Sequence, residues 1–167
     1  MKNIKQKMAV TLATLIVFAG FAAKADTSAT LFLEGYIETI TELYIDPVIG
    51  AATTLNIVGG ETARNIAAVT ETSNNPDGYE ILMASENAGL LTHTNGTSNT
   101  AYSIAYDGAA TAVQPTAVGS EVTVKTVAGP LAGTVTDTSP VDITVTAGGA
   151  LPAGAYTDTL IFTMQAL

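Results

Sequence analysis

The residues that could carry out acid–base chemistry are few and lie far apart along the chain. The only histidine, His93, lies in the polar sequence Leu-Thr-His-Thr-Asn-Gly, where a turn predicts a solvated imidazole. Three aspartates, Asp137, Asp142 and Asp158, are the carboxylates to consider as an acid–base pair. Each lies on the outward or turn-flanking part of a Thr-rich run, which predicts a solvated face. No nucleophile elbow, phosphate-binding loop or zinc-protease motif is present, and we expect that the chain is not an enzyme.

Metal and cofactor chemistry is equally poorly supported. Residues 74–78, Asn-Asn-Pro-Asp-Gly, bring oxygen ligands together but lack the spaced acidic series of a calcium loop. They predict a plain turn. The chain has no cysteine and one histidine, which excludes disulfides, thiolate chemistry and Cys/His-rich metal sites. We expect no cofactor and no metal.

Residues 1–25 have the organisation of a secretory signal peptide. Lys2, Lys5 and Lys7 precede an apolar run over residues 8–23, and Ala-Lys-Ala at 23–25 has the small-x-small pattern of a cleavage site. The apolar run is too short and wrongly flanked for a membrane anchor. We expect cleavage before Asp26, so that the mature chain covers residues 26–167.

This mature chain is strongly acidic. Four of the six basic residues lie within the predicted signal peptide and all 15 acidic residues follow it, so residues 26–167 have a net charge of 2 − 15 = −13. Such a chain repels phosphate backbones, which excludes nucleic-acid binding. Its length suits one domain.

The elements that must position these residues are strands. Threonine is the most frequent residue type after the predicted signal peptide, and its branched Cβ favours extended backbone. Short alternating runs end at Gly, Pro and Asn turns. Apart from the predicted signal peptide, no apolar pattern with a helical period is long enough to predict a helix. We predict one all-β domain, an antiparallel sandwich or barrel. The predicted strands cover residues 31–45, 53–58, 65–72, 79–85, 90–94, 102–106, 121–127, 141–146 and 155–167.

The last predicted strand has an apolar face. A strand of this kind needs a neighbour on each side, because otherwise it leaves unpaired backbone groups and an apolar strip at the sheet edge. The residues on that face are Tyr156, Leu160, Phe162 and Met164.

The segment that follows the signal is the complementary feature. Ala29, Leu31 and Leu33 lie on one face of residues 26–35, and Phe32 competes with them as the inward residue. Alternate small and apolar residues on a free terminus suit insertion into a groove of another molecule, where the backbone ladder supplies affinity.

Several segments resemble chaperone–usher pilins. The ending over residues 151–163 resembles their Pro-Ala-Gly-x-Tyr-x-Asp-Thr-hydrophobic ending and is most similar to the archaic class and the spore coat protein U domain. Residues 29–37 resemble the alternating N-terminal extension and first strand. Residues 78–85 and 102–108 resemble the Gly-Tyr strand and the Tyr-x-hydrophobic-x-Tyr strand of that family.

The resemblance implies an incomplete immunoglobulin-like antiparallel sandwich that is completed by donor-strand exchange. A periplasmic chaperone would fill the gap until the N-terminal strand of the next subunit replaces it at an outer-membrane usher. The implied parts are a signal peptide (1–25), a donor strand (26–36) and a pilin sandwich (37–167). The chain departs from the pilins that carry a disulfide starting in the first strand, because it is cysteine-free. The implied donor residues are Ala29, Leu31, Phe32 and Leu33, and the implied edge of the acceptor groove is Tyr156, Leu160, Phe162 and Met164.

The expected function is therefore a structural subunit of a surface fimbria, a homopolymer of identical subunits that is secreted through the periplasm to the cell surface. Two alternatives remain. One is a tip adhesin or carbohydrate-binding module, although a chain without tryptophan offers a poor aromatic platform. The other is a non-fimbrial secreted coat or matrix β-sandwich.

Overall fold

The computed structural model describes residues 30–167. The predicted signal peptide and the predicted donor residue Ala29 lie outside the described residues. By its contacts the chain divides between Tyr36 and Ile37. In the first part, residues 30–36 form no strand, and the side chains of Leu31, Phe32 and Leu33 are 82%, 82% and 81% exposed.

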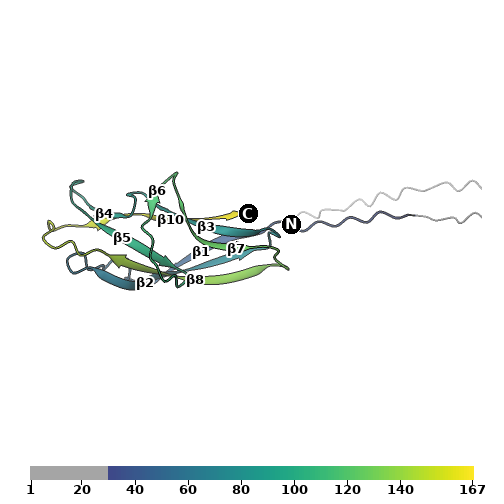
Figure 1. The fold of residues 1–167 in the computed structure, drawn as a ribbon, viewed down its shortest axis with the longest axis horizontal. Coiled ribbons are helices and arrows are strands. Elements are labelled where there is room, and N and C mark those ends of the chain that lie inside the picture. The colour runs from purple at the N-terminus through teal and green to yellow at the C-terminus, as the bar shows by residue number, and fades with distance from the viewer. Residues whose placement is uncertain (1–29) are drawn as a thin grey trace, which may run out of the picture. The chain divides into compact units, whose positions relative to one another are not determined.

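Residues 37–167 contain strands and turns only, with no helix among the described residues. The first sheet has six strands in the order β1-β2-β8-β5-β4-β9, and the second has β3 at its centre, with β10 on one side and β7 and the short parallel β6 on the other (Figure 1). The prediction of an all-β fold with antiparallel sheets is confirmed, and the curled sheets are consistent with a sandwich. The strands are β1 Thr41–Pro47, β2 Glu61–Ser73, β3 Gly78–Ser85, β4 Leu90–His93, β5 Asn99–Tyr106, β6 Thr116–Ala117, β7 Val122–Ala128, β8 Val135–Val145, β9 Tyr156–Thr157 and β10 Leu160–Ala166.

Alternation along the strands builds one core. Successive side chains of a strand point to opposite faces, so the buried residues of β5 and of the second half of β8 occur at every second position. Five of the most deeply buried apolar side chains, each at most 1% exposed, come from four strands of both sheets: Val69, Ile81, Met83, Ile104 and Val141.

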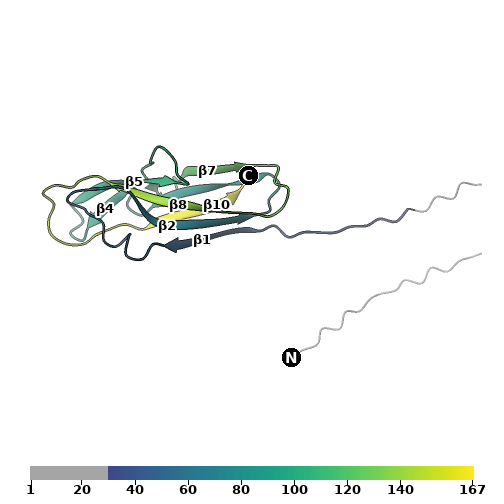
Figure 2. The same cartoon turned by 90° about the horizontal axis from the view of Figure 1, so that it is seen from below.

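The start of β1 and the end of β10 lie at the same end of the domain. Thr41 pairs with Ser73 at the end of β2, and Ala166 pairs with Tyr79 at the start of β3. Residues 74–77 join β2 to β3, so this turn marks the shared end, which we call the 74–77 end. β1 therefore runs away from it and β10 runs toward it, as the arrows in Figure 2 show.

The strand predicted for residues 53–58 is wrong, because this segment forms turns. Its backbone has no strand as a partner and bonds in part to side chains: Asn56 N–H donates to Glu61 Oε1 over 2.8 Å, and Gly59 N–H, just after the segment, donates to Asn56 Oδ1 over 2.8 Å. Side chains that offer such local bonds compete with a sheet ladder. The extended run predicted from residue 31 is also shorter than expected, since β1 begins at Thr41.

The last predicted strand is broken into two. β9 pairs with β4 in the first sheet, whereas β10 pairs with β3 in the second, so the chain changes sheets at Asp158 and Thr159. Asp158 fixes this change: Oδ1 accepts from Asn87 N–H at 2.9 Å and Thr159 N–H at 2.8 Å, and Oδ2 accepts from Tyr102 O–H at 2.9 Å. One continuous strand over residues 155–167 was therefore a wrong prediction.

Candidate functional site

β10 is an edge strand with an unused row of backbone groups. Among residues 30–167 its only paired strand is β3. The Thr159 carbonyl accepts from Glu86 N–H at 3.1 Å, and Leu167 N–H donates to the Gly78 carbonyl over 3.2 Å, so the odd-numbered residues bond to β3. Because hydrogen-bonding direction alternates along an antiparallel strand, the even-numbered residues of β10 point their N–H and C=O groups away from β3.

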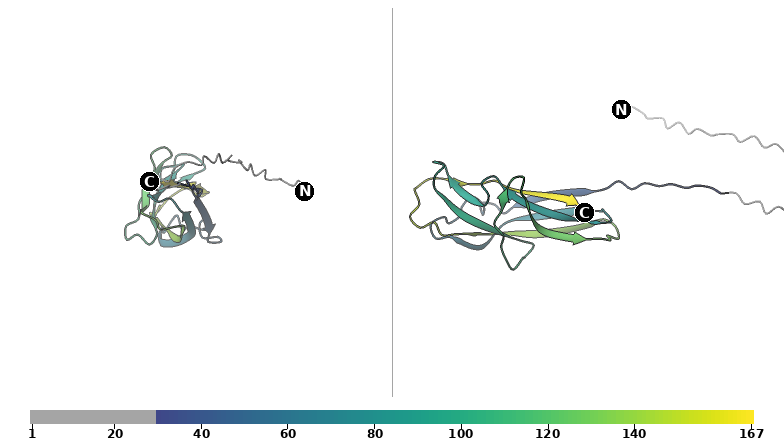
Figure 3. Two further views of the ribbon diagram at one scale, coloured as in Figure 1. Left: turned by 90° about the vertical axis from the view of Figure 1, so that its right-hand side faces the viewer. Right: turned by 45° about the horizontal axis from the view of Figure 1, so that its top comes forward.

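β1 is the corresponding edge of the first sheet. Val48 N–H donates to the Ile66 carbonyl over 2.9 Å, and the Ile40 carbonyl accepts from Asn74 N–H at 3.3 Å, so the even-numbered residues bond to β2. The odd-numbered residues, Leu43 among them, therefore point their backbone groups away from β2. β1 and β10 are neighbours but belong to different sheets (Figures 2 and 3). We call the region between these two unpaired edges the open side.

The open side exposes part of the core. Its apolar side chains pack against buried core residues and yet are only half-buried. The Phe162 ring lies 5.4 Å from the buried Tyr106 ring, measured between centroids. Two unpaired backbone edges with an apolar floor are what a further strand needs for docking. The floor residues on the two strands are Leu43, Leu160, Phe162 and Met164.

Two cavities lie where β10 begins, at the end of the domain opposite the 74–77 end. Their volumes are about 540 Å³ and 190 Å³, and both are lined by Leu55, Leu91 and Asp158. Leu160 of the open side lines the smaller one. The apolar part of the lining comes from Leu55, Ile57 and Leu91 in the larger cavity and from Leu55, Ile66 and Leu160 in the smaller one.

The predicted acceptor residues do not share one strand. Leu160, Phe162 and Met164 lie on β10, whereas Tyr156 lies on β9. The Tyr156 hydroxyl donates to the Pro152 carbonyl over 2.9 Å, and its ring lies 4.9 Å from the His93 ring. Leu43 is not among the predicted site residues, although the alternation of residues 41–45 could have identified it.

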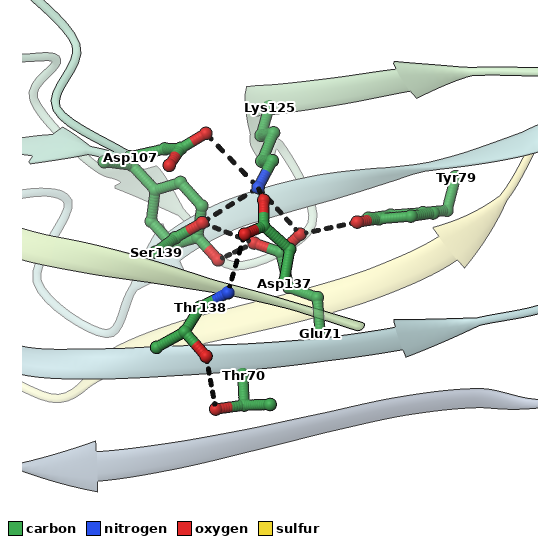
Figure 4. A network of polar contacts seen from close by, with 9 residues as sticks. Thr70, Glu71, Tyr79, Asp107, Lys125, Asp137, Thr138 and Ser139 are labelled. Atoms are coloured by element: carbon green, nitrogen blue, oxygen red, sulfur yellow. Dashed lines mark hydrogen bonds and ion pairs between the residues drawn. The ribbon is translucent and has the colours of Figure 1, made fainter. Parts of the chain in front are cut away.

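A buried ion-pair cluster joins the two sheets, and Figure 4 shows it. Lys125 of β7 is 10% exposed, and its Nζ contacts Asp137 Oδ2 at 2.7 Å, Glu71 Oε2 at 3.1 Å and Asp107 Oδ2 at 3.2 Å. Asp107 and Asp137 are about half exposed, whereas the Glu71 side chain is fully buried. Lys125 also donates to Ser139 Oγ over 2.9 Å.

Three hydroxyl groups complete the bonding of Glu71. Its Oε2 accepts from Tyr79 O–H at 2.8 Å, and its Oε1 accepts from Tyr106 O–H at 2.5 Å and from Ser139 O–H at 2.9 Å. Burial, together with the bond to Glu71, raises the pKa of both tyrosines well above the ordinary value. Burial alone would lower the pKa of Lys125, but its hydrogen bonds to Asp137 and Glu71 outweigh burial and raise it.

The cluster is built to hold charge rather than to transfer protons. Lys125 remains an ammonium group near neutral pH, because its raised pKa is far above 7. No buried side-chain nitrogen or oxygen lacks a hydrogen-bond partner in the part of the chain that the structure describes. The cluster connects β2 and β8 of one sheet to β7 of the other, so we assign it to stability.

The predicted acid–base candidates are not brought together. Asp137 contacts Lys125, Asp142 Oδ1 accepts from Asn65 Nδ2 at 2.9 Å, and Asp158 supports the change of sheet. His93 Nδ1 accepts from Asn95 N–H at 3.0 Å, so its Nε2 donates to the Ala153 carbonyl over 3.2 Å. No group of three or more acidic or histidine side chains suited to a metal ion occurs among residues 30–167.

Within residues 30–167 there is also no helix of the length and hydropathy needed to cross a membrane. Comparison with known proteins gave no match, either to a protein-family model or to a curated protein.

Proposed function

We propose that the chain is a structural subunit of a surface fimbria and polymerises by donating residues 26–36 to the open side of a neighbouring copy. In this proposal the domain is an immunoglobulin-like sandwich that lacks one strand. The partners are identical subunits, with a periplasmic chaperone and an outer-membrane usher during secretion to the cell surface.

The observation that carries the proposal is the match between two parts of one chain. β1 and β10 leave backbone groups unpaired above a half-buried apolar floor. Residues 30–36 form no strand, and Leu31, Phe32 and Leu33 are more than four-fifths exposed. Fully burying one leucine side chain contributes about 1.5–3 kcal/mol, so docking Leu31 and Leu33 alone would contribute about 3–6 kcal/mol besides the new backbone bonds.

The face that enters follows from the sequence. Ala29, Leu31 and Leu33 share a face with Gly35, whereas Phe32 shares its face with Glu34. A carboxylate on an apolar floor is costly to bury. In the proposal, the odd-numbered face therefore docks and Phe32 points outward.

A fused donor strand tests the proposal. A second copy of residues 26–36 is joined to Leu167 through a short glycine-containing turn, which lets it run antiparallel to β10. We expect a monomer with a melting temperature at least about 10 °C above that of the unfused chain, since several kcal/mol are gained. The control is the same fusion with aspartate in place of the copied residues Leu31 and Leu33. Equal melting temperatures of the two fusions would exclude the donor role.

A second test uses the natural filaments. The double variant Leu31→Asp/Leu33→Asp should reach the periplasm and form no filaments that an antibody to this chain decorates in electron micrographs. The matched variant Thr30→Asp changes the opposite face and should retain filaments. Filaments in the double variant would move the donor role to another segment. A tip adhesin would give single molecules at fibre ends, whereas a shaft subunit labels the fibre along its length.

A further inference from the structure

One residue, Asn74, holds the segment that joins the donor residues to β1 in line with that strand. Asn74 Oδ1 accepts from Ile40 N–H at 2.6 Å, and Asn74 Nδ2 donates to the Glu38 carbonyl over 2.8 Å. Asn74 N–H also donates to the Ile40 carbonyl over 3.3 Å. These three bonds continue the pairing of β1 with β2 beyond Thr41, and we call them the Asn74 brace.

The sequence of the joining segment works in the same direction. Residues 36–40 are Tyr-Ile-Glu-Thr-Ile, which contains three β-branched residues and none of the Gly, Pro, Asn or Asp residues that favour tight turns. Gly35 is the nearest residue with turn-forming freedom. The segment is therefore stiff by composition as well as by its bonds.

If the joining segment stays straight, the donor residues can reach the open side of a neighbouring copy but not that of their own domain. β1 already leaves the 74–77 end along one edge of the open side. Residues 29–35 could enter the open side of their own domain only if the chain reversed within residues 36–40, in the manner of a β-hairpin. Hairpin loops have two to five residues, so a reversal centred on Glu38 and Thr39 would break the bond of Glu38 to Asn74 and disturb those of Ile40.

Without such a constraint, insertion into the same domain would be favoured. A segment tethered by a short linker has an effective concentration on the order of 1 mM. At micromolar protein, a neighbouring copy would therefore compete at a disadvantage of roughly a thousandfold. The donor segment of a neighbouring copy needs no such reversal, because it can enter this open side in its straight form, antiparallel to β10.

We infer that the Asn74 brace and the turn-poor sequence of residues 36–40 prevent the donor segment from filling its own domain and direct it to a second copy. This inference rests on the proposed function and adds its regulation. Asn74 is a positioning residue: it lies outside the open side and acts through Glu38 and Ile40.

The test is to permit the reversal. One variant, Asn74→Ala, removes the side-chain bonds of the brace, and a second, Glu38→Asn/Thr39→Gly, introduces an Asn-Gly turn and keeps Asn74. A third combines the three substitutions. We expect the combined variant to lower the polymerised fraction at least tenfold at micromolar protein and to yield a self-filled monomer. In that monomer, residues 30–36 should be protected from amide hydrogen exchange, and Leu31→Asp/Leu33→Asp in the same background should abolish the protection.

The matched control is Asn95→Ala, which removes an asparagine that likewise accepts backbone N–H groups, from Thr97 at 2.9 Å and Ser98 at 3.2 Å, in a different loop. It should polymerise as the unmodified chain does. The inference is overturned if the combined variant polymerises at the rate of the unmodified chain and gives no monomer with protected residues 30–36. If Asn74→Ala prevents folding, the Glu38→Asn/Thr39→Gly variant is judged by the same criterion. The fused donor strand separates the two failures: a fusion that stays stabilised overturns the brace alone, and a fusion that gains no stability overturns the fimbrial proposal with it.

Discussion

Replacing Lys125 by methionine should destabilise the domain severely, because it leaves the buried Glu71 carboxylate without its cation. Glu71 is 0% exposed and lies 3.1 Å from Nζ, so water cannot replace the lost charge. Asp107 and Asp137 are about half exposed and can be solvated. Removing one partner of a buried pair costs about 3–5 kcal/mol, a large part of the roughly 5–15 kcal/mol that holds a domain folded.

The assay is unfolding in urea, monitored by tyrosine fluorescence, with all variants compared in the same assembly state. The chain has no tryptophan and six tyrosines, and two of these, Tyr79 and Tyr106, bond directly to Glu71, so part of the signal comes from the cluster. We expect Lys125→Met to lose about 3–5 kcal/mol. The matched control is Arg64→Met, which breaks a partly exposed pair with Glu61 and two exposed hydrogen bonds to Thr54. It should lose less, about 1–2 kcal/mol.

A double variant separates the charge from the loss of packing. Lys125→Met/Glu71→Gln removes both charges of the buried pair. The amide oxygen of the glutamine introduced at position 71 can still accept a hydrogen bond from the hydroxyl groups that bonded to Glu71. It should recover about 2 kcal/mol or more relative to Lys125→Met, since neutral replacement of a buried pair is often well tolerated. A double variant that is no more stable than Lys125→Met, or a loss below about 1 kcal/mol in the single variant, would refute the assignment of the cluster to stability.

Three further predictions concern pH, a glycine and the change of sheet. The two tyrosines that donate to Glu71 have raised pKa values in the folded chain, so the unfolded chain loses these protons at lower pH. The free energy of unfolding should therefore stay level up to about pH 10 and fall above it. A free energy of unfolding that stays level to about pH 11 would contradict this. Gly78→Ala should cost roughly 1–3 kcal/mol more than Gly119→Ala, because both have positive φ but only the methyl group at Gly78 meets a backbone carbonyl; equal denaturation midpoints would disprove the collision. Asp158→Ala should lower the free energy of unfolding by about 2–3 kcal/mol, measured by denaturation, since three donors lose their acceptor. Asp142→Ala removes the acceptor of one side-chain donor and should lower it by less than about 1 kcal/mol. Similar losses in the two variants would show that Asp158 does not hold the change of sheet between β9 and β10.

The central strands were predictable because their local pattern and their burial agree. β3 and β5 lie close to the predicted ranges 79–85 and 102–106, and both alternate between the core and the outside. β8 was predicted to begin at Val141, after Pro140, but it begins at Val135. Pro140 is tolerated because its ring nitrogen faces Asp107, where β5 ends and the chain turns away.

The open side was predicted in part, and the cluster was not. The apolar face of the last strand indicated an edge, but the chain's change of sheet at Asp158 depends on Asn87 and Tyr102, which lie far away in sequence. Glu71 follows Val69 in the inward alternation of β2, yet a polar run of this composition predicts a solvated face. The burial of Glu71 depends on Lys125 of the other sheet and on three hydroxyl donors from other strands, and the local sequence of β2 indicates none of these contacts.

The burial of Lys125 also affects how accessible the basic side chains are to proteases and to reagents that modify amines. Beyond the predicted signal peptide the chain has two basic side chains, Arg64 and Lys125. Lys125 is 10% exposed with its ammonium group surrounded by three carboxylates, and Arg64 is 30% exposed and paired with Glu61. Enzymes that cleave after lysine or arginine find only these two positions, each within a strand and paired. We therefore expect the folded domain to resist trypsin-like cleavage at these two positions. We also expect the Lys125 side chain to react with amine-directed reagents only when the two sheets separate.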